Sequence, residues 1–273
     1  MLNSHIQWTQ HTWNPWHGCS KISPGCKFCY MYRDKDRYNQ DPKTVLKSKD
    51  NTFRKPLSWK EPAQVFTCSW SDFFIAEADE WRPDAWEIIK NTPHLQYQIL
   101  TKRPERIAQC LPNDWGDGYP NVWLGVSSEN EELTYKRISL LLTIPTKVRF
   151  ISAEPLLEGV LSVRNNAVIR QLDWVIIGGE SGNDFGIHRY RPMELDWAQE
   201  LVDFCEVSDV ACFNKQLGTY QAKKLRLMDK DGGDMREWSH SLQVRQFPAY
   251  YYSYNNHIAE VRRLNSPIQL KLL

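Results

Sequence analysis

Three cysteines near the N-terminus have the residue type and spacing of a metal-binding loop. Six residues separate Cys19 from Cys26, and two separate Cys26 from Cys29. A Pro-Gly pair in the longer interval favours a turn that brings the three thiols together. Three thiolates without an obvious fourth ligand suit a [4Fe-4S] cluster in which one iron stays open to a small molecule. We therefore predict a cluster loop over residues 17–30.

Zinc is an alternative for the same loop. His17 stands directly before it and could join the three cysteines in a closed Cys₃His site, which would be structural. A loop without any metal is the third interpretation. Metal analysis of protein prepared without oxygen distinguishes the three.

We predict that the remaining four cysteines are small core residues, because they lie in apolar segments. They are Cys68, Cys110, Cys205 and Cys212. The total of seven is odd, and the N-terminal residues have neither the basic start nor the apolar stretch of a secretion signal. We expect a cytoplasmic protein without a disulfide framework.

Short apolar segments alternate with helical patterns and would position the reactive residues. The expected strands are residues 5–9, 65–68, 97–100, 122–126, 148–151, 174–177 and 210–213. Near-continuous apolar strands separated by helices are typical of buried parallel strands. We predict an α/β fold: a complete or partial (β/α) TIM-like barrel with six to seven parallel strands. A doubly wound open sheet is the alternative.

Charged side chains follow these segments at the ends where barrels form their active sites. They are Asp72, Lys102, Glu129, Glu154, Glu180 and Lys215. Any one of them could instead cap a helix or join an ion pair. Their recurrence after successive strands favours a functional pocket. A metal-free hydrolase with Glu154 and Glu180 as acid and base is one further hypothesis.

The charge distribution points to a polyanionic partner. Eleven Lys and Arg against four Asp and Glu give residues 1–60 a net charge of +7, and ten against five give residues 215–273 a net charge of +5. Residues 61–214 carry −11. Basic ends suggest a nucleic-acid or nucleotide partner. With four aromatic residues expected to be exposed, they also support the alternative of a zinc-stabilised module that binds nucleic acid or a partner protein. The four are Trp13, Trp16, Tyr30 and Tyr32.

Composition and length limit the class of protein. The chain has 273 residues, of which 41% are hydrophobic and 25% charged. No apolar run approaches the roughly 18 residues that a membrane span requires, so we expect no membrane partner. We predict a barrel over residues 1–217 and a turn-rich basic C-terminal extension over residues 218–273.

A set of short motifs along nearly the whole chain resembles one family. The motifs are residues 8–9, 12–15, 18–19, 23–26, 29–30, 71–74, 98–106, 122–127, 149–156, 173–182 and 215–216. The chain is similar to a largely uncharacterised family from phages, prophages and bacteria with a related three-cysteine motif. That family resembles radical S-adenosylmethionine (SAM) iron–sulfur enzymes.

The resemblance implies a mechanism. In radical SAM enzymes the cysteine loop follows the first barrel strand, and an aromatic residue commonly precedes the last cysteine, as Phe28 does here. The open iron binds the amino and carboxylate groups of SAM, and one electron cleaves the carbon–sulfur bond. The products are methionine and a 5′-deoxyadenosyl radical that abstracts hydrogen from the substrate. An electron donor is required, and the resemblance suggests a separately encoded protein partner.

The resemblance also implies roles for residues at the mouth. Asp72 would contact the SAM amine, and Ser127 or Glu129 would hold the ribose hydroxyls. Gly178 and Gly179 would let the backbone approach adenine. This Gly-Gly-Glu motif follows the sixth expected strand, whereas radical SAM enzymes usually have it after the second. The other residues expected to bind the cofactor are Ser69, Lys102, Glu154, Glu180 and Lys215.

Overall fold

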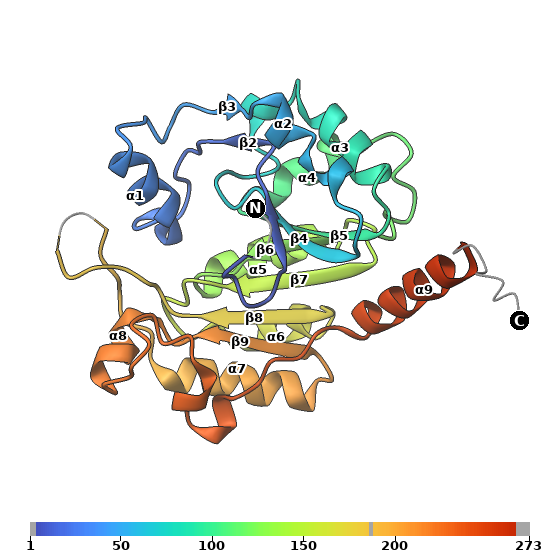
Figure 1. The fold of residues 1–273 in the computed structure, drawn as a ribbon. Helices are drawn as coiled ribbons and strands as arrows, with labels where there is room; N and C mark the ends of the chain where they lie inside the picture. Colours follow the sequence, from blue (N-terminus) through green and yellow to red (C-terminus); the bar gives the residue numbers. More distant parts are fainter. Residues whose placement is uncertain (1–3, 186–187, 266–273) are drawn as a thin grey trace, which may run out of the picture.

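The computed structural model describes residues 4–185 and 188–265 and contains one curled parallel sheet of seven strands (Figure 1). The strands are β1 (His11–Trp13), β4 (Ala63–Thr67), β5 (Leu95–Thr101), β6 (Val122–Ser127), β7 (Val148–Ala153), β8 (Trp174–Gly178) and β9 (Ala211–Gln216). They lie side by side in chain order, and every pair is parallel. The predicted partial TIM-like barrel is confirmed. A doubly wound sheet is excluded, because its strand order would reverse partway.

Helices follow the strands in turn. They are α1 (Tyr30–Arg37), α2 (Asp50–Phe53), α3 (Arg82–Lys90), α4 (Ile107–Cys110), α5 (Glu131–Leu141), α6 (Val163–Ile169), α7 (Leu195–Val207), α8 (Gly218–Lys224) and α9 (Ala249–Asn265). A small antiparallel pair, β2 (Trp16–His17) and β3 (Leu46–Lys47), lies outside the sheet. In the described part of the chain, no helix is long and apolar enough to cross a membrane.

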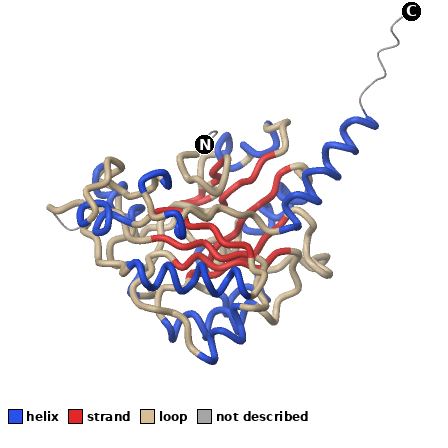
Figure 2. The backbone as a smooth tube through the Cα atoms, turned by 90° about the horizontal axis from the view of Figure 1, so that it is seen from below, coloured by secondary structure: helices blue, strands red, loops and turns tan. Residues whose placement is uncertain are grey.

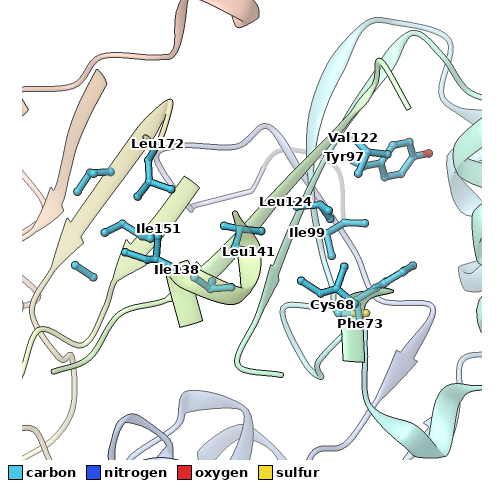
Figure 3. Packing of buried hydrophobic residues seen from close by; sticks show 14 of the residues in the cluster. Cys68, Phe73, Tyr97, Ile99, Val122, Leu124, Ile138, Leu141, Ile151 and Leu172 are labelled. Carbon is cyan, nitrogen blue, oxygen red and sulfur yellow. The ribbon is translucent and has the colours of Figure 1, made fainter. Parts of the chain in front are cut away.

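The outer face of the sheet packs against the helices because alternate strand residues point to opposite faces. Leu124 and Ile151 belong to the same buried cluster as Ile138 and Leu141 of α5. Figure 3 shows these α5 side chains lying against the sheet. The four cysteines outside the loop are also buried, as predicted.

The inner face forms a second core of large aromatic rings. Trp123, Phe150, Trp174 and Phe213 alternate in sequence with the outward residues, and all four are buried. The rings of Trp123 and Trp174 meet edge to face at 5.8 Å. Aromatic side chains of this volume fill the concavity of a partial barrel that has no strands to close it.

The first strand lies later than expected. Residues 5–9 form bends and turns, and β1 begins at His11. Thr9 takes the place of a strand residue, because its hydroxyl accepts the Phe66 backbone N–H at 3.0 Å and donates to His11 O. Trp8 is thereby directed onto the inner face, where its ring contacts Phe66 at 4.7 Å. The apolar residues before Thr9 therefore fill the barrel instead of extending the sheet.

The residues after Leu217 pack onto the barrel. Trp238 and Leu242 belong to the outer core cluster. The 17-residue helix α9 lies at the end opposite α1, and it extends away from the body of the molecule (Figures 1 and 2). The Tyr250 hydroxyl donates to Pro120 O, directly before β6, so α9 covers the amino end of the sheet. The segment expected to be turn-rich thus contains two helices.

Candidate functional site

The cysteine loop lies over the carboxyl ends of the strands. It follows β1 and β2, turns through the 3₁₀ segment Pro24–Cys26, and ends where α1 begins. Its start is held by the segment after β4, since Gly18 N donates to Trp70 O at 3.0 Å and Ser71 Oγ donates to Gly18 O at 2.6 Å. The loop therefore occupies the mouth at which barrels of this type place their active sites.

Asp72 and Arg103 form the first anchor of the loop. The Asp72 carboxylate accepts the Lys102 backbone N–H at 2.9 Å and the Arg103 guanidinium at 3.1 Å, and both acidic and basic side chains are buried. Arg103 then donates to the Ser20 carbonyl at 3.0 Å and to the Ser20 hydroxyl at 2.8 Å. It also approaches Cys19 Sγ at 3.7 Å. In this arrangement Asp72 positions the arginine, and its contact with a SAM amine stays a prediction.

Glu129 forms the second anchor, and its side chain is fully buried. Its carboxylate accepts the Ser23 hydroxyl and the Gly25 backbone N–H, each at 2.7 Å. Lys102 Nζ lies at 2.7 Å and Arg137 at 3.2 Å. Burial disfavours the charged carboxylate, but the two cations and the hydrogen bonds from Lys102 and Ser23 outweigh it and lower the pKa of Glu129 to about 2. Glu129 is therefore a permanent negative charge that holds the loop.

Gly25 is required by this contact. A Cβ atom added at Gly25 would lie 2.4 Å from the carboxylate carbon of Glu129, which is inside any normal contact distance. The Pro-Gly pair predicted as a turn thus has a second purpose, because only glycine lets the carboxylate reach the backbone.

Glu180 and Arg191 form the third anchor. Arg191 donates to both carboxylate oxygens of Glu180, at 2.9 and 2.6 Å. The same guanidinium donates to Pro24 O at 3.0 Å and lies over the Phe28 ring at 5.4 Å. Such a bidentate pair has fixed geometry, so it holds the loop in one orientation.

The three thiols lie near a common side chain, Tyr32 on α1. Its hydroxyl donates to Cys19 O at 2.5 Å. Burial raises the pKa of Tyr32 to about 12, and the charges of Cys19, Cys29 and Cys26 add to the rise. Burial also raises the pKa of the Cys19 thiol to about 12 despite the nearby Arg103, and it raises the pKa of Cys29. These two thiols are protonated at neutral pH, so metal binding would release their protons.

The donor set fits an iron–sulfur cluster in its chemistry, since three free thiols share one anchored loop beside cationic groups. Across residues 4–185 and 188–265, no three His, Cys, Asp or Glu side chains are gathered closely enough to hold a metal ion. The thiols would have to turn toward a common point when they bind one.

His17, the expected fourth zinc ligand, has another partner. Its Nδ1 lies 2.6 Å from Lys35 Nζ of α1. Burial and then the charge of Lys35 lower the pKa of His17. In this geometry Nδ1 of the neutral ring accepts a hydrogen bond from Lys35 Nζ, so coordination of zinc through Nδ1 would require this hydrogen bond to break.

Glu154 and Lys215 form a fourth ion pair, at 2.8 Å, on the inner face of the mouth. Glu154 also accepts the Ser152 hydroxyl at 3.0 Å. The Glu154 side chain is 14% exposed, more than the carboxylates of the three anchors, and Lys215 is 21% exposed. Burial raises the pKa of the Tyr30 hydroxyl, and the charges of Cys29 and Glu154 add to this rise. Glu154 is therefore close to Tyr30, at the end of the cysteine loop.

The glycine pair after β8 allows close packing. A Cβ atom at Gly178 would lie 2.4 Å from Glu154 Oε1, and one at Gly179 would lie 2.3 Å from Leu217 O. Gly178 therefore gives room to the glutamate of the fourth ion pair. An approach of adenine to this backbone stays a prediction.

The two serines of the expected set lie at the same mouth. Ser127 ends β6, is buried, and its carbonyl accepts a hydrogen bond from Arg137 at 3.0 Å. Ser69 follows β4, and its hydroxyl accepts a hydrogen bond from Asn14 at 3.0 Å. Its carbonyl accepts the Tyr30 hydroxyl at 2.5 Å. Ser69 and Glu129 thus contact the loop directly, and Asp72, Lys102 and Glu180 contact it through an ion-pair partner.

Three of the four aromatic residues expected to be exposed are buried. Trp13, Trp16 and Tyr32 are at most 8% exposed, and Tyr30 alone has an open ring, at 40%. The prediction of a stacking surface is wrong for these three, because indole and phenol rings next to a barrel strand gain more from core packing than from water. The Trp16 N–H, for example, donates to the Asp72 backbone carbonyl.

Two residues that hold the loop were not among those predicted from the sequence. Arg103 directly follows Lys102, and its place at a strand end was a usable signal. Arg191 lies in a long loop before α7, eleven positions from its partner Glu180, and nothing in the sequence marks it.

The fold and the site together define a partial (β/α) barrel protein with a cysteine loop anchored over its carboxyl-terminal mouth. The chain belongs to the family described as "Protein of unknown function (DUF5131)", whose family model matches residues 3–248. No curated protein matches the chain, and no solved structure does.

Proposed function

We propose that this protein is a radical SAM-type enzyme in which Cys19, Cys26 and Cys29 hold a [4Fe-4S] cluster. The observation that carries the proposal is the position of the loop. Three carboxylate–cation pairs from the ends of β4, β5, β6 and β8 hold it over the mouth of the barrel. A structural zinc site would not need to be held at the mouth, where barrels bind their substrates.

The protein's own residues would supply binding and orientation. A cluster with one open iron supplies one-electron cleavage of SAM, with the electron delivered by a separate donor. Arg103 and Lys102 place positive charge beside the thiols and would stabilise their anionic form. The anchors hold the loop in one position during turnover, as a preorganised site requires.

Glu154 and Lys215 are the charged side chains that we assign to ligand contact. Both are partly exposed on the inner face, and their hydrogen bonds go to each other and to Ser152. Glu154 can accept hydroxyl hydrogen bonds, and Lys215 can bind an anionic group. The basic ends of the chain support a nucleic acid or nucleotide as the substrate class.

The test is metal analysis followed by a SAM-cleavage assay. Protein prepared anaerobically and reconstituted should contain about four irons per chain. After reduction with dithionite it should convert SAM to 5′-deoxyadenosine and methionine. Cys26→Ala should lose both the iron and the cleavage. Cys205→Ala removes another buried thiol, on α7 and outside the loop, and should keep both.

Colourless protein with one zinc per chain would contradict the proposal and support the structural-zinc alternative. Brown protein that neither binds nor cleaves SAM after reduction would contradict the assignment of radical chemistry while retaining the cluster. Glu154→Gln and Lys215→Met should retain the cluster and weaken SAM or substrate use, which separates their role from that of the loop.

A further inference from the structure

The positive charge of the N-terminal region is concentrated in the cysteine loop and the segment after it. The eleven Lys and Arg and the four Asp of residues 1–60 all lie between Lys21 and Lys60. This segment lies between β1 and β4 and contains α1, β3 and α2 (blue in Figure 1). Residues 61–214, which supply most of the barrel, carry −11. A polyanion is therefore attracted to the side that carries the loop and repelled by the acidic barrel.

Two lysines of the cysteine loop are exposed and have no acidic partner. Lys21 Nζ donates to Lys27 O at 2.9 Å, so the two residues lie side by side. Lys21 also lies over the ring of Tyr32 at 4.4 Å, and Lys27 lies over the ring of Phe28 at 5.1 Å. Within the described residues, neither ammonium group forms an ion pair with a carboxylate. Their charges are therefore available to an anion from outside the molecule.

Tyr30 presents an open aromatic ring at the start of α1. Its side chain is 40% exposed, and its hydroxyl is held by donation to Ser69 O at 2.5 Å. Glu154, which we assign to ligand contact, is close to this hydroxyl. The Cα atoms of Lys27 and Tyr30 are at most about 11 Å apart, because the two residues are three positions apart in the chain. Three stacked nucleotides at roughly 3.4 Å each cover the same span.

We propose that this rim of the mouth binds a single-stranded nucleic acid, with phosphates at Lys21 and Lys27 and a base stacked on Tyr30. The inference rests on the proposed function, since the stacked base would enter the mouth beside Glu154. A duplex keeps its bases stacked on one another and does not offer one to the tyrosine. An acidic protein would satisfy the lysines, but the open ring beside them favours a ligand with planar bases.

Fluorescence anisotropy with a labelled oligothymidine of about 15 nucleotides tests the proposal on the full-length protein, without iron or SAM. The double variant Lys21→Gln/Lys27→Gln should weaken binding about tenfold at about 50 mM salt. It should also lower the slope of log K against log salt by about 1.4, which is two phosphate contacts at roughly 0.7 each. Lys136→Gln/Lys147→Gln removes the same charge from two exposed lysines of the barrel and should change neither quantity.

Tyr30→Leu should weaken binding about tenfold and leave the salt slope unchanged, because it removes the ring and no charge. Tyr30→Phe keeps the ring and should bind as tightly as the parent protein. Tyr135→Leu is the matched control, since Tyr135 on α5 is also 40% exposed, and it should have no effect.

The inference is overturned if the oligothymidine does not bind at about 100 µM protein. It is also overturned if a duplex or a polyglutamate of equal charge binds as tightly, or if the lysine double variant or Tyr30→Leu binds like the parent. Oligonucleotide binding by a protein that takes up no iron would contradict only the proposed function. An iron-loaded protein that cleaves SAM but does not bind the oligonucleotide would contradict only this inference.

Discussion

At the scale of single residues, the buried carboxylates at the mouth hold the cysteine loop, whereas their positions after strands predicted contact with a cofactor. Asp72 and Glu180 are each paired with an arginine that contacts the cysteine loop, and Glu129, paired with Lys102, contacts the loop itself. Removing one member of such a buried ion pair leaves the other charge uncompensated, which costs about 3–5 kcal/mol. These residues therefore decide whether the loop keeps its place.

Glu129→Gln should change the acid stability of the protein. The folded pKa of Glu129 is depressed from 4.5 to about 2, so its stabilising contribution is fully present above pH 4.5 and is lost as the pH falls toward 2. The full contribution corresponds to about 3 kcal/mol. Urea unfolding at several pH values should show the parent protein losing this much more stability than the variant over that range.

Glu132→Gln is the control, since this glutamate is exposed on α5. Its acid profile should match that of the parent. If the free energies of unfolding of Glu129→Gln and the parent protein fall equally with pH, the Glu129 carboxylate is not a buried anion.

Gly25→Ala should displace the loop without removing any charged group. The new methyl would overlap the Glu129 carboxylate, and overpacking of this kind costs about 1–3 kcal/mol. We expect a lower unfolding temperature and less iron bound per chain after reconstitution. Gly159→Ala is the control, because its nearest neighbour would be an indole carbon at 3.3 Å, and it should bind iron normally. Normal iron content in Gly25→Ala would argue against the Glu129 anchor.

At the scale of elements, the two ends of the sheet are covered by different parts of the chain. The cysteine loop and α1 cover the carboxyl ends, and α9 covers the amino ends (Figure 1). The family model ends at residue 248, directly before α9, so this helix lies outside the matched region. The match includes the loop and every strand.

Tyr254→Ala should show how firmly α9 is attached. Tyr254 is 8% exposed, and its hydroxyl bonds to Pro93 O before β5. Removing a buried aromatic side chain costs about 3–5 kcal/mol. Chemical denaturation should report a loss of this size. The neighbouring Tyr252 is 55% exposed, and Tyr252→Ala should cost far less. Equal effects would mean that α9 does not pack on the barrel as described.

At the scale of the whole molecule, the anchored loop joins strands that are distant in sequence. The loop is tied to the ends of β4, β5, β6 and β8 through Ser71, Arg103, Glu129 and Arg191. Anything that orders the loop should therefore stabilise the entire sheet. The edge strands of the partial barrel are β1 and β9, and residues 244–246 hydrogen-bond to the backbone of β9.

Loading the cysteines should raise the unfolding temperature of the whole protein. A ligand bound at a hundred times its dissociation constant adds about 2.7 kcal/mol, or roughly 5–10 °C for a domain of this size. Calorimetry of reconstituted and chelator-treated protein should show this difference in a single transition. Cys26→Ala should melt at the same temperature under both conditions. A shift that persists in Cys26→Ala would place the bound metal elsewhere.

Much of this organisation is predictable from local patterns. The apolar segments from Val122 and Trp174 are strands within a residue or two of the expected bounds, because a continuous apolar run between polar ends has no stable alternative to a buried strand. The first strand was missed since Trp8 and Thr9 carry the composition of a strand but serve to fill the barrel. Residue types alone do not distinguish these two uses.

The amino-acid sequence alone determined the α/β class, the cluster of three cysteines and the recurrence of charged residues after the strands, since each depends on neighbours along the chain. Only the tertiary structure decided which of these charges hold the loop. Glu129 meets Gly25 across 104 positions and Arg191 meets Pro24 across 167. The curl of the sheet brings these distant residues into contact, and burial strengthens the electrostatic attraction between them.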